Sequence, residues 1–418
     1  MTKNKTGNFG KFLLLWAGEL ISSIGGGLTS FGLGVYIFQK TGSAASMALV
    51  TLLGFLPTLL LSVPAGVLAD RYDRRLLMMI GDGCSALGIT YILLCMMRGG
   101  ASLAQICVGV SVSAVFSALL EPSFRATITD LLTKEEYSKA SGLVSLAGSA
   151  RYLFSPVIAG FLLTVSDVKL LLVIDICTFV LTVISAAVVR KGIRSNIPEK
   201  REAFARSIAE GWRVIRSKKG VLLLVAISSA VTLFMGMFQI LAEPMILSFA
   251  DAKTLGAAET ICACGMLVSG VVLGFRGLKG HYVRTLGISL ILAGICMAGF
   301  GAFENMIPIC AFGFLFFSML PLANNCLDYL TRTNIPDEVQ GRAWGLIGFL
   351  SQLGYVLAYA VSGAAADAVG RIGGCGVGRG AAAVIMAAGI CLAVIAGLIL
   401  VPESIRKLEE PFNIRKDC

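Results

Sequence analysis

Charge is scarce in this chain. Asp, Glu, Lys and Arg make up 14% of the 418 residues, and His281 is the single histidine. A soluble domain carries about a quarter of its residues as charged types to cover its surface. The shortage therefore excludes an ordinary soluble fold, and one histidine argues against a metal centre or catalytic triad that relies on imidazole.

Site motifs of enzymes are lacking as well. Most of the twelve cysteines fall inside apolar segments, where a thiol behaves as a small hydrophobe. Cys262 and Cys264 do not have zinc-site spacing. The glycine-rich stretch 370–380 lacks the Gly-Lys-Ser/Thr ending of a phosphate-binding loop. With no nucleophile and base pair in view, we expect no enzyme activity, no metal and no cofactor.

Hydrophobic residues are abundant, at 56% of the chain. A membrane-crossing helix needs about 20 mostly apolar residues. This criterion predicts an all-α integral membrane protein with twelve transmembrane helices. Their predicted ranges are 12–38, 45–68, 76–97, 102–124, 141–165, 170–190, 220–247, 256–275, 284–303, 306–331, 341–366 and 376–401.

The positions of Lys and Arg predict the orientation. If the N-terminus is cytoplasmic, 28 of the 35 basic residues fall in cytoplasmic segments and 6 in outside loops. Cytoplasmic loops of membrane proteins carry such an excess, so we expect both termini to lie inside a cell membrane. The net charge of +10 follows from this pattern and gives no reason to expect nucleic acid. The first segment is too long for a cleaved signal and is expected to remain.

The chain divides into two related halves. Residues 1–190 and 220–418 each hold six predicted helices, and 191–219 connects them. Within the connection, apolar residues recur at helical spacing, which predicts an amphipathic helix on the inner leaflet, although a solvated charged linker remains an alternative. Segments 132–143 and 335–346 align at an offset of 203, and the same offset places Gly160 on Gly363. We therefore predict two parallel six-helix repeats.

One loop resembles a known signature. Residues 66–75 read Gly-Val-Leu-Ala-Asp-Arg-Tyr-Asp-Arg-Arg, between predicted helices 2 and 3. This is similar to the Gly-x-x-x-Asp-Arg-x-Gly-Arg-Arg loop of the major facilitator superfamily, with Asp73 in place of the second glycine. A degenerate copy follows at 270–284. Ser155 to Gly160 resembles the Gly-Pro-x-x-Gly-Gly exporter motif, and Tyr359 stands in the other half where Pro156 would be.

Within that superfamily the chain resembles the bacterial drug-efflux branch that includes macrolide efflux proteins. The resemblance implies a monomeric secondary active transporter that exports small amphipathic molecules by alternating access, with protons exchanged and membrane lipids around it. The arginine motif that many proton antiporters carry in helix 4 is not evident. A lysophospholipid flippase or siderophore exporter of the same fold remains open. A receptor or scaffold without transport is disfavoured by the acids inside the predicted helices.

Charged groups inside a membrane are expensive and often functional. The resemblance implies that predicted helices 1, 4, 7 and 10 line the cavity, and each carries an acid. Burial disfavours the charged form of a carboxylate as deep as Glu19, so we expect Glu19 to carry the coupling proton, or else to pair with Arg151. The acids of the cavity helices are Glu19, Glu121, Glu243 and Asp328.

Two further charges inside the predicted helices, Arg151 and Asp175, are candidates with Glu19, Glu121 and Glu243 for binding protons or substrate. Both also need partners, which the sequence leaves open. Asp82 and Glu259 lie nearer helix ends and are expected to reach the interface. For Arg125 and Asp328, related by the 203 offset, we expect an ion pair that closes an inner gate, or two separate headgroup-level charges.

The signature loop implies a second gate. In the family, the acid equivalent to Asp70 packs against the N-terminus of the eleventh helix, here near residue 340, where a carboxylate meets unpaired N–H groups. Arg71 belongs to the same loop. Arg74 would bridge to Asp130 and stabilise the outward-facing state.

Aromatic side chains on the predicted cavity helices are candidates for an apolar lining, although packing between helices explains such residues equally well. They are Phe31, Phe116, Phe234, Phe238, Phe312 and Phe316.

Overall fold

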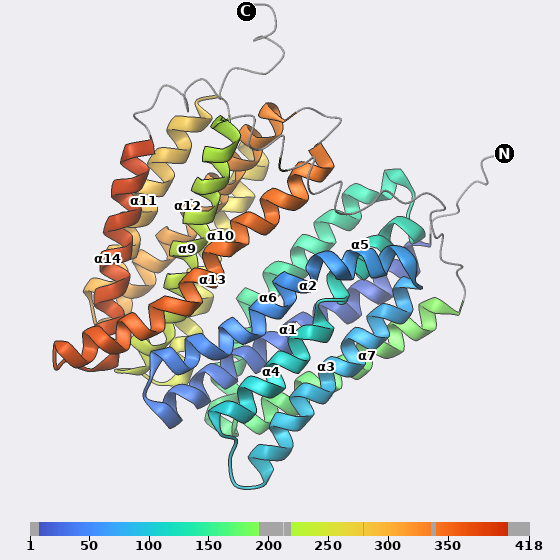
Figure 1. The fold of residues 1–418 in the computed structure, drawn as a ribbon, viewed down its shortest axis with the longest axis horizontal. Helices are drawn as coiled ribbons and strands as arrows, with labels where there is room; N and C mark the ends of the chain where they lie inside the picture. The colour runs from blue at the N-terminus through green and yellow to red at the C-terminus, as the bar shows by residue number, and fades with distance from the viewer. Residues whose placement is uncertain (1–7, 192–211, 213–218, 279, 336–339, 400–418) are drawn as a thin grey trace, which may run out of the picture. The chain divides into compact units, whose positions relative to one another are not determined.

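A computed structural model describes residues 8–191, 212, 219–278, 280–335 and 340–399 (Figure 1). Within these ranges, twelve helical spans are long and apolar enough to cross a membrane, which confirms the predicted fold class. The predicted connection 191–219 lies almost wholly outside the described residues. The helices are α1 Phe9–Thr41, α2 Ala44–Arg71, α3 Arg74–Met97, α4 Leu103–Ser117, α5 Leu120–Leu131, α6 Tyr137–Val165, α7 Val168–Arg190, α9 Lys219–Leu247, α10 Ala252–Arg276, α11 Tyr282–Ala302, α12 Met306–Asn334, α13 Gln340–Ile372 and α14 Gly376–Ile399.

The fourth span is interrupted. The single helix predicted over 102–124 is divided into α4 and α5 at Ala118 and Leu119. Pro122 has no N–H to bond the Ala118 carbonyl, and its ring clashes with that carbonyl, so the α-helical pattern breaks one turn before it. The polypeptide nevertheless continues as one span from Leu103 to Leu131.

Many large apolar side chains of the spans are exposed. Large side chains such as Leu87, Phe161, Leu357 and Val394 have more than half of their area accessible. Exposed apolar surface of this extent is unfavourable in water and suits contact with lipid chains.

The chain forms two compact units. The first consists of residues 1–42, 49–200 and 251–257. In it, α1 packs against α6 and α7, while α3 packs against α4, α5 and α7. A core cluster that includes Phe12, Leu15, Met78 and Phe124 is buried where these helices meet.

The second unit consists of residues 43–48, 201–250 and 258–418. In it, α11 packs against α12 and α14, and α13 packs against α9 and α14. A smaller core cluster includes Val221, Val225 and Ile347.

Two helices are divided between the units. The first residues of α2 belong to the second unit, and the first residues of α10 belong to the first unit. Within the second unit, the Asp367 carboxylate of α13 accepts hydrogen bonds from Ser43 Oγ at 2.6 Å, from Ala44 N–H at 2.9 Å and from Ala45 N–H at 3.2 Å. Asp367 thus caps the N-terminus of α2, where N–H groups lack partners.

The predicted equivalence of Gly160 and Gly363 appears in parallel contacts. A Cβ atom added to Gly363 would lie 2.6 Å from the Ala44 carbonyl oxygen, and one added to Gly160 would lie 2.7 Å from that of Ala252. In both units, therefore, the lack of a side chain at a glycine allows the backbone at the start of another helix to pack closely against it. This supports the internal repeat at offset 203.

Candidate functional site

The signature loop is anchored by buried ion pairs. Arg74 Nη1 donates to Asp130 Oδ1 at 2.7 Å and to the Ala126 carbonyl at 2.9 Å, while Arg74 Nε donates to the Ala69 carbonyl at 3.3 Å. Arg75 Nη2 reaches the second carboxylate oxygen of Asp130 at 3.2 Å. These side chains are at most 9% exposed. The bridge predicted between Arg74 and Asp130 is present, and Arg75 joins it.

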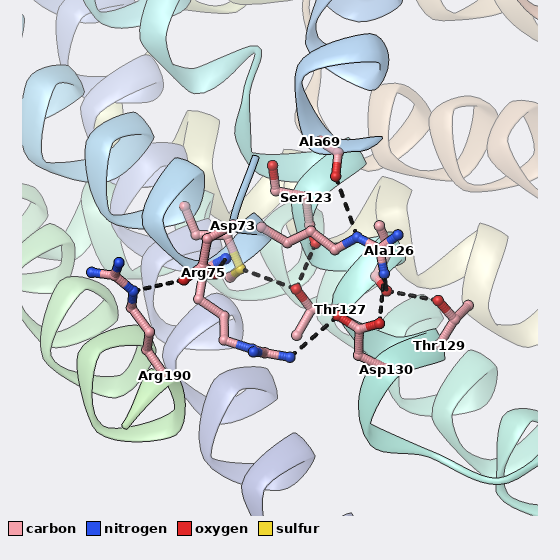
Figure 2. Close-up of polar contacts among 11 residues, drawn as sticks. Ala69, Asp73, Arg75, Ser123, Ala126, Thr127, Thr129, Asp130 and Arg190 are labelled. Carbon is pink, nitrogen blue, oxygen red and sulfur yellow. Dashed lines mark hydrogen bonds and ion pairs between the residues drawn. The ribbon is translucent and has the colours of Figure 1, made fainter. Parts of the chain in front are cut away.

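Asp73 has a role that the sequence did not reveal (Figure 2). Its carboxylate accepts from the Arg75 N–H at 3.1 Å, which caps α3, and from Arg190 Nε of α7 at 2.7 Å. Burial alone would raise the pKa of Asp73, but the hydrogen bonds from Arg190 and Arg75 outweigh it, so its pKa is lowered. An Asp directly before an apolar helix is the pattern of an N-cap and could have indicated this.

The other members of the loop, Asp70 and Arg71, are exposed at the end of α2. The contact expected between Asp70 and the start of α13 would join the two units and stays a prediction.

Charges predicted for the inner gate are exposed in their own units. Arg125 Nη2 lies 2.8 Å from Glu121 Oε1, one turn away in α5, and both side chains are largely exposed. Asp328 of α12 is exposed and interacts electrostatically with Arg332. The expected pairing of Arg125 with Asp328 therefore stays a prediction, and Glu121 is the partner that the structure gives Arg125.

Helices α1 and α7 approach closely along a line of glycines. Gly18, Gly25 and Gly32 of α1 recur every seven residues, and a Cβ at each would lie within 3.0 Å of a side chain of α7. At Gly25, the nearest atoms are Thr178 Oγ1 at 2.5 Å and Asp175 Oδ1 at 2.9 Å. The absence of side chains on this face of α1 lets polar groups of α7 lie against it.

Asp175 and Arg151 acquire partners here. Asp175 is 1% exposed, interacts electrostatically with Arg151 of α6 and lies beside Thr29 of α1. Arg151 Nη2 donates to Ser30 Oγ at 3.2 Å. The alternative pairing of Glu19 with Arg151 gains no support from these contacts.

The expectation that Asp82 reaches the interface is wrong. Asp82 is 1% exposed in α3, and it interacts with Thr182 of α7 and with the charges of Glu19 and Asp175. Its place near the helix start says little about depth, because helix orientation decides which face is covered. Ser85, one turn later and 0% exposed, gives a polar i, i+3 pair that could have indicated a buried face.

The second unit has an acid pair of its own. Glu243 of α9 and Glu259 of α10 are both partly buried and interact electrostatically. Glu259 thus faces another acid, a contact that its predicted place near the interface did not indicate. One turn before Glu243, Gln239 Oε1 accepts a hydrogen bond from Tyr359 at 3.0 Å. Tyr359 fills the position that Pro156 occupies in the first half.

The aromatic candidates are mainly interior. The ring of Phe238 is stacked on Phe316 and tilted against Phe300, each with centroids 4.6 Å apart. These contacts favour the packing alternative for Phe238 and Phe316. Phe31, which is 4% exposed, is likewise buried. Phe116 and Phe312 are partly buried.

One aromatic candidate borders an open groove. Phe234, with Met237, Val384, Ala387 and other apolar residues of α9, α13 and α14, lines an open apolar groove of about 490 Å³ on the second unit. Over the described residues as a whole, no group of three His, Cys, Asp or Glu side chains is placed to hold a metal ion.

Comparison with known proteins identifies relatives along most of the chain. The sequence model of the Major Facilitator Superfamily matches residues 15–359. Macrolide efflux protein A of Streptococcus pyogenes is 26% identical over 377 residues, which cover 86% of this chain and 90% of that protein. The multidrug efflux pump Tap of Mycolicibacterium fortuitum is 25% identical over 389 residues, covering 88% and 92%.

Solved structures share the fold at low identity. A bacterial homologue of the human lysosomal transporter Spinster, in an inward-facing conformation, has a TM-score of 0.73 at 14% identity and covers 97% of this chain and 98% of its own. The nucleoside transporter NupG, as its D323A mutant, has a TM-score of 0.75 at 11% identity, covering 93% and 99%. At such identities the likeness shows the fold alone.

Proposed function

We propose that this chain, which belongs to the Major Facilitator Superfamily, exports small amphipathic molecules across the cell membrane in exchange for protons. It is a multi-pass membrane protein with efflux proteins among its relatives. Those relatives match nearly their whole length, so the proposal does not depend on one shared segment. The proposal also includes that the protein works as a monomer by alternating access and that both of its termini lie in the cytoplasm.

The proposal of proton exchange rests on the surroundings of the Glu19 carboxylate. Glu19 lies in the membrane-spanning part of α1, is partly buried, and has another acid, Glu121, as its electrostatic neighbour. A carboxylate in this setting gains from binding a proton, because burial and a neighbouring negative charge both disfavour its charged form. When deprotonated it attracts a cationic drug, so the proton and the drug compete for one group.

Two sets of charges are proposed to gate the pathway. The Arg74, Arg75 and Asp130 cluster holds the 66–75 loop rigid, which leaves Asp70 and Arg71 at its exposed end free to engage the start of α13. Arg125 exchanges its partner Glu121 for Asp328 when the inner side closes. An exposed i, i+4 pair is worth only about 0.5 kcal/mol, so this exchange has a small energetic cost.

Drug-susceptibility profiling tests the function. The chain is expressed in an efflux-deficient host, and resistance to macrolides, cationic dyes and other amphipathic cations is measured. We expect raised resistance to at least one class, abolished when the proton gradient is collapsed. Glu19→Gln, which keeps the size of the side chain but cannot carry a proton, should lose that resistance at unchanged expression.

Glu304→Gln supplies the matched control. Glu304 forms an exposed ion pair with Arg379, away from the proposed machinery, and the variant should retain the resistance of the wild type. Proton-coupled transport that is unchanged in Glu19→Gln vesicles would refute the role of Glu19. No resistance across all classes would refute drug export and favour a lysophospholipid or siderophore cargo.

A further inference from the structure

We propose that Asp82 and Asp175 form a proton-binding site inside the first unit, in which a proton is held between buried carboxyl groups and threonine hydroxyls of α1 and α7. The binding of the proton stands on the contacts below. Its use in coupling rests, in addition, on the proposed function.

The two carboxyl groups are enclosed by membrane-spanning helices. Asp82 of α3 and Asp175 of α7 are each 1% exposed, and α3 and α7 pack against one another. A carboxylate in such a place has lost its water, and only a cation or hydrogen-bond donors can replace that water.

The charges that face this pair do not balance. Asp82 interacts with the acids Glu19 of α1 and Asp175, and Asp175 interacts with Arg151 of α6. Among the described residues, Arg151 is the one cation that interacts with any of these three acids, and it also donates to Ser30. Like charges held close together in a dry interior cannot all be ionised, so at least one carboxyl group binds a proton.

The hydroxyl groups indicate where the proton lies. A threonine hydroxyl has one hydrogen. Thr182 Oγ1 donates to the backbone carbonyl oxygen of Phe179 at 2.9 Å. Thr178 Oγ1 donates to the backbone carbonyl oxygen of Asp175 at 2.7 Å. While Thr182 donates its one hydrogen to the backbone, it has none left to stabilise a charged Asp82. A protonated Asp82 can instead donate to the Thr182 oxygen.

Two buried oxygens nearby are still unsatisfied. Within the described residues, Asp82 Oδ1 and Thr29 Oγ1 have no hydrogen-bond partner, although Asp82 is 1% and Thr29 6% exposed. Thr29 lies beside Asp175 without completing a hydrogen bond. Unsatisfied polar atoms are rare in protein interiors. Here Asp82 Oδ1 is a buried oxygen that can hold a proton, and the Thr29 hydroxyl can donate to a charged Asp175.

The space suits a proton better than a metal cation. A Cβ atom at Gly25 would already lie 2.9 Å from Asp175 Oδ1, so α1 leaves little room at this carboxylate. A hard cation needs about six oxygen ligands, and no cluster of acids fit for a metal exists in the described part of the chain.

The site is connected to an exposed group by neighbouring acids. Glu121, which is largely exposed, interacts with Glu19, and Glu19 interacts with Asp82. Each acid thus has another as its electrostatic neighbour, from the exposed side chain inward to Asp175. Because binding a proton at one carboxyl weakens its repulsion of the next, protonation at Glu121 or Glu19 alters proton affinity at Asp82.

Infrared spectroscopy tests the site without requiring transport. The full-length protein is placed in lipid nanodiscs, and the carbonyl stretch of protonated carboxyl groups is followed from acidic to alkaline pH. We expect this band at neutral pH, and we expect Asp82→Asn and Asp175→Asn each to remove part of it. Asp167→Asn, a change at the exposed N-cap of α7, should leave it intact.

A band that is unchanged in both aspartate variants, with wild-type elution and melting temperature, would overturn the proposal. So would a band that disappears when sodium replaces choline in the buffer, because the site would then hold a metal cation. Thr182→Val covers the case in which the aspartate variants misfold. It keeps both carboxyl groups, and we expect it to shift the frequency of the Asp82 band, while an unshifted band counts against the site. Failure of drug export in the susceptibility assay would leave these infrared results standing.

Discussion

Asp73 and Arg190 join the signature loop to the end of α7 through a hydrogen bond of 2.7 Å between a carboxylate oxygen and Nε. In the family signature this position is a glycine. Here the same residue caps α3, so one side chain fixes the start of one helix and the end of another.

This pair predicts a pH dependence. The lowered pKa of Asp73 means that its charge stabilises the folded state. That stabilisation is fully present above the pKa of an unfolded Asp, about 3.9, and is lost as the pH falls through the lower folded-state pKa. Asp73→Asn, which retains a capping side chain, should lower the melting temperature slightly at neutral pH. The difference should vanish in acid, and a difference independent of pH would contradict the assignment.

The buried pairs at Asp130 predict a much larger effect. Asp130→Asn leaves the guanidinium groups of Arg74 and Arg75 in the interior without their carboxylate. Breaking a buried pair from one side costs about 3–5 kcal/mol. Glu304→Gln breaks an exposed pair and should cost about 1 kcal/mol or less. Unfolding in detergent measures both, and equal losses would contradict a buried location of the Asp130 ion pairs.

The glycine line of α1 offers two adjacent substitutions with opposite signs. Gly25→Ala would place a methyl group 2.5 Å from Thr178 Oγ1, whereas a Cβ at Gly26 meets nothing within 4 Å. Overpacking typically costs about 1–3 kcal/mol, while replacing a helical glycine by alanine gains about 0.5–1 kcal/mol. We therefore expect Gly25→Ala to melt earlier and Gly26→Ala later than the wild type. Similar melting temperatures for the two would count against close contact between α1 and α7.

The cap on α2 predicts a local change. Asp367→Asn keeps the size of the side chain but provides one acceptor oxygen instead of two, and it loses the charge that favours a helix N-terminus. The amides of Ala44 and Ala45 should exchange their hydrogens about ten-fold faster, as expected for a loss of about 1.4 kcal/mol in local stability. Hydrogen-exchange mass spectrometry of this peptide provides the measurement. If the amides of Ala44 and Ala45 exchange at the wild-type rate in Asp367→Asn, and the rest of the protein also does, Asp367 does not cap α2.

Most of the fold could be predicted from the sequence because lipid allows few backbone arrangements. A span must satisfy its own N–H and C=O groups, so an apolar run of sufficient length forms a helix. The predicted 76–97 became α3 Arg74–Met97, and the predicted 220–247 became α9 Lys219–Leu247. The break before Pro122 was missed, although the missing N–H of proline is a local signal for it.

The candidate site was harder to predict because depth depends on helix rotation and on partners distant in the chain. Arg74 and Asp130 could be paired through the family signature. Asp82 could not be placed, since its distance from a helix end does not say which face α7 covers. The polar stripe of Asp175, Thr178 and Thr182 was readable as a helical periodicity, but only the glycines of α1 show what it faces.

Those glycines place a limit on how this protein can change. Adding one residue between Gly18 and Gly25 would rotate everything after it by about 100°, turning Gly25 and Gly32 away from α7 and pressing bulky side chains against Asp175. Substitutions on the lipid-facing side of α1 leave the alignment intact. Natural variation in this helix should therefore consist of exchanged residues and very rarely of gained or lost ones, a pattern that counting gaps in related genes can reveal.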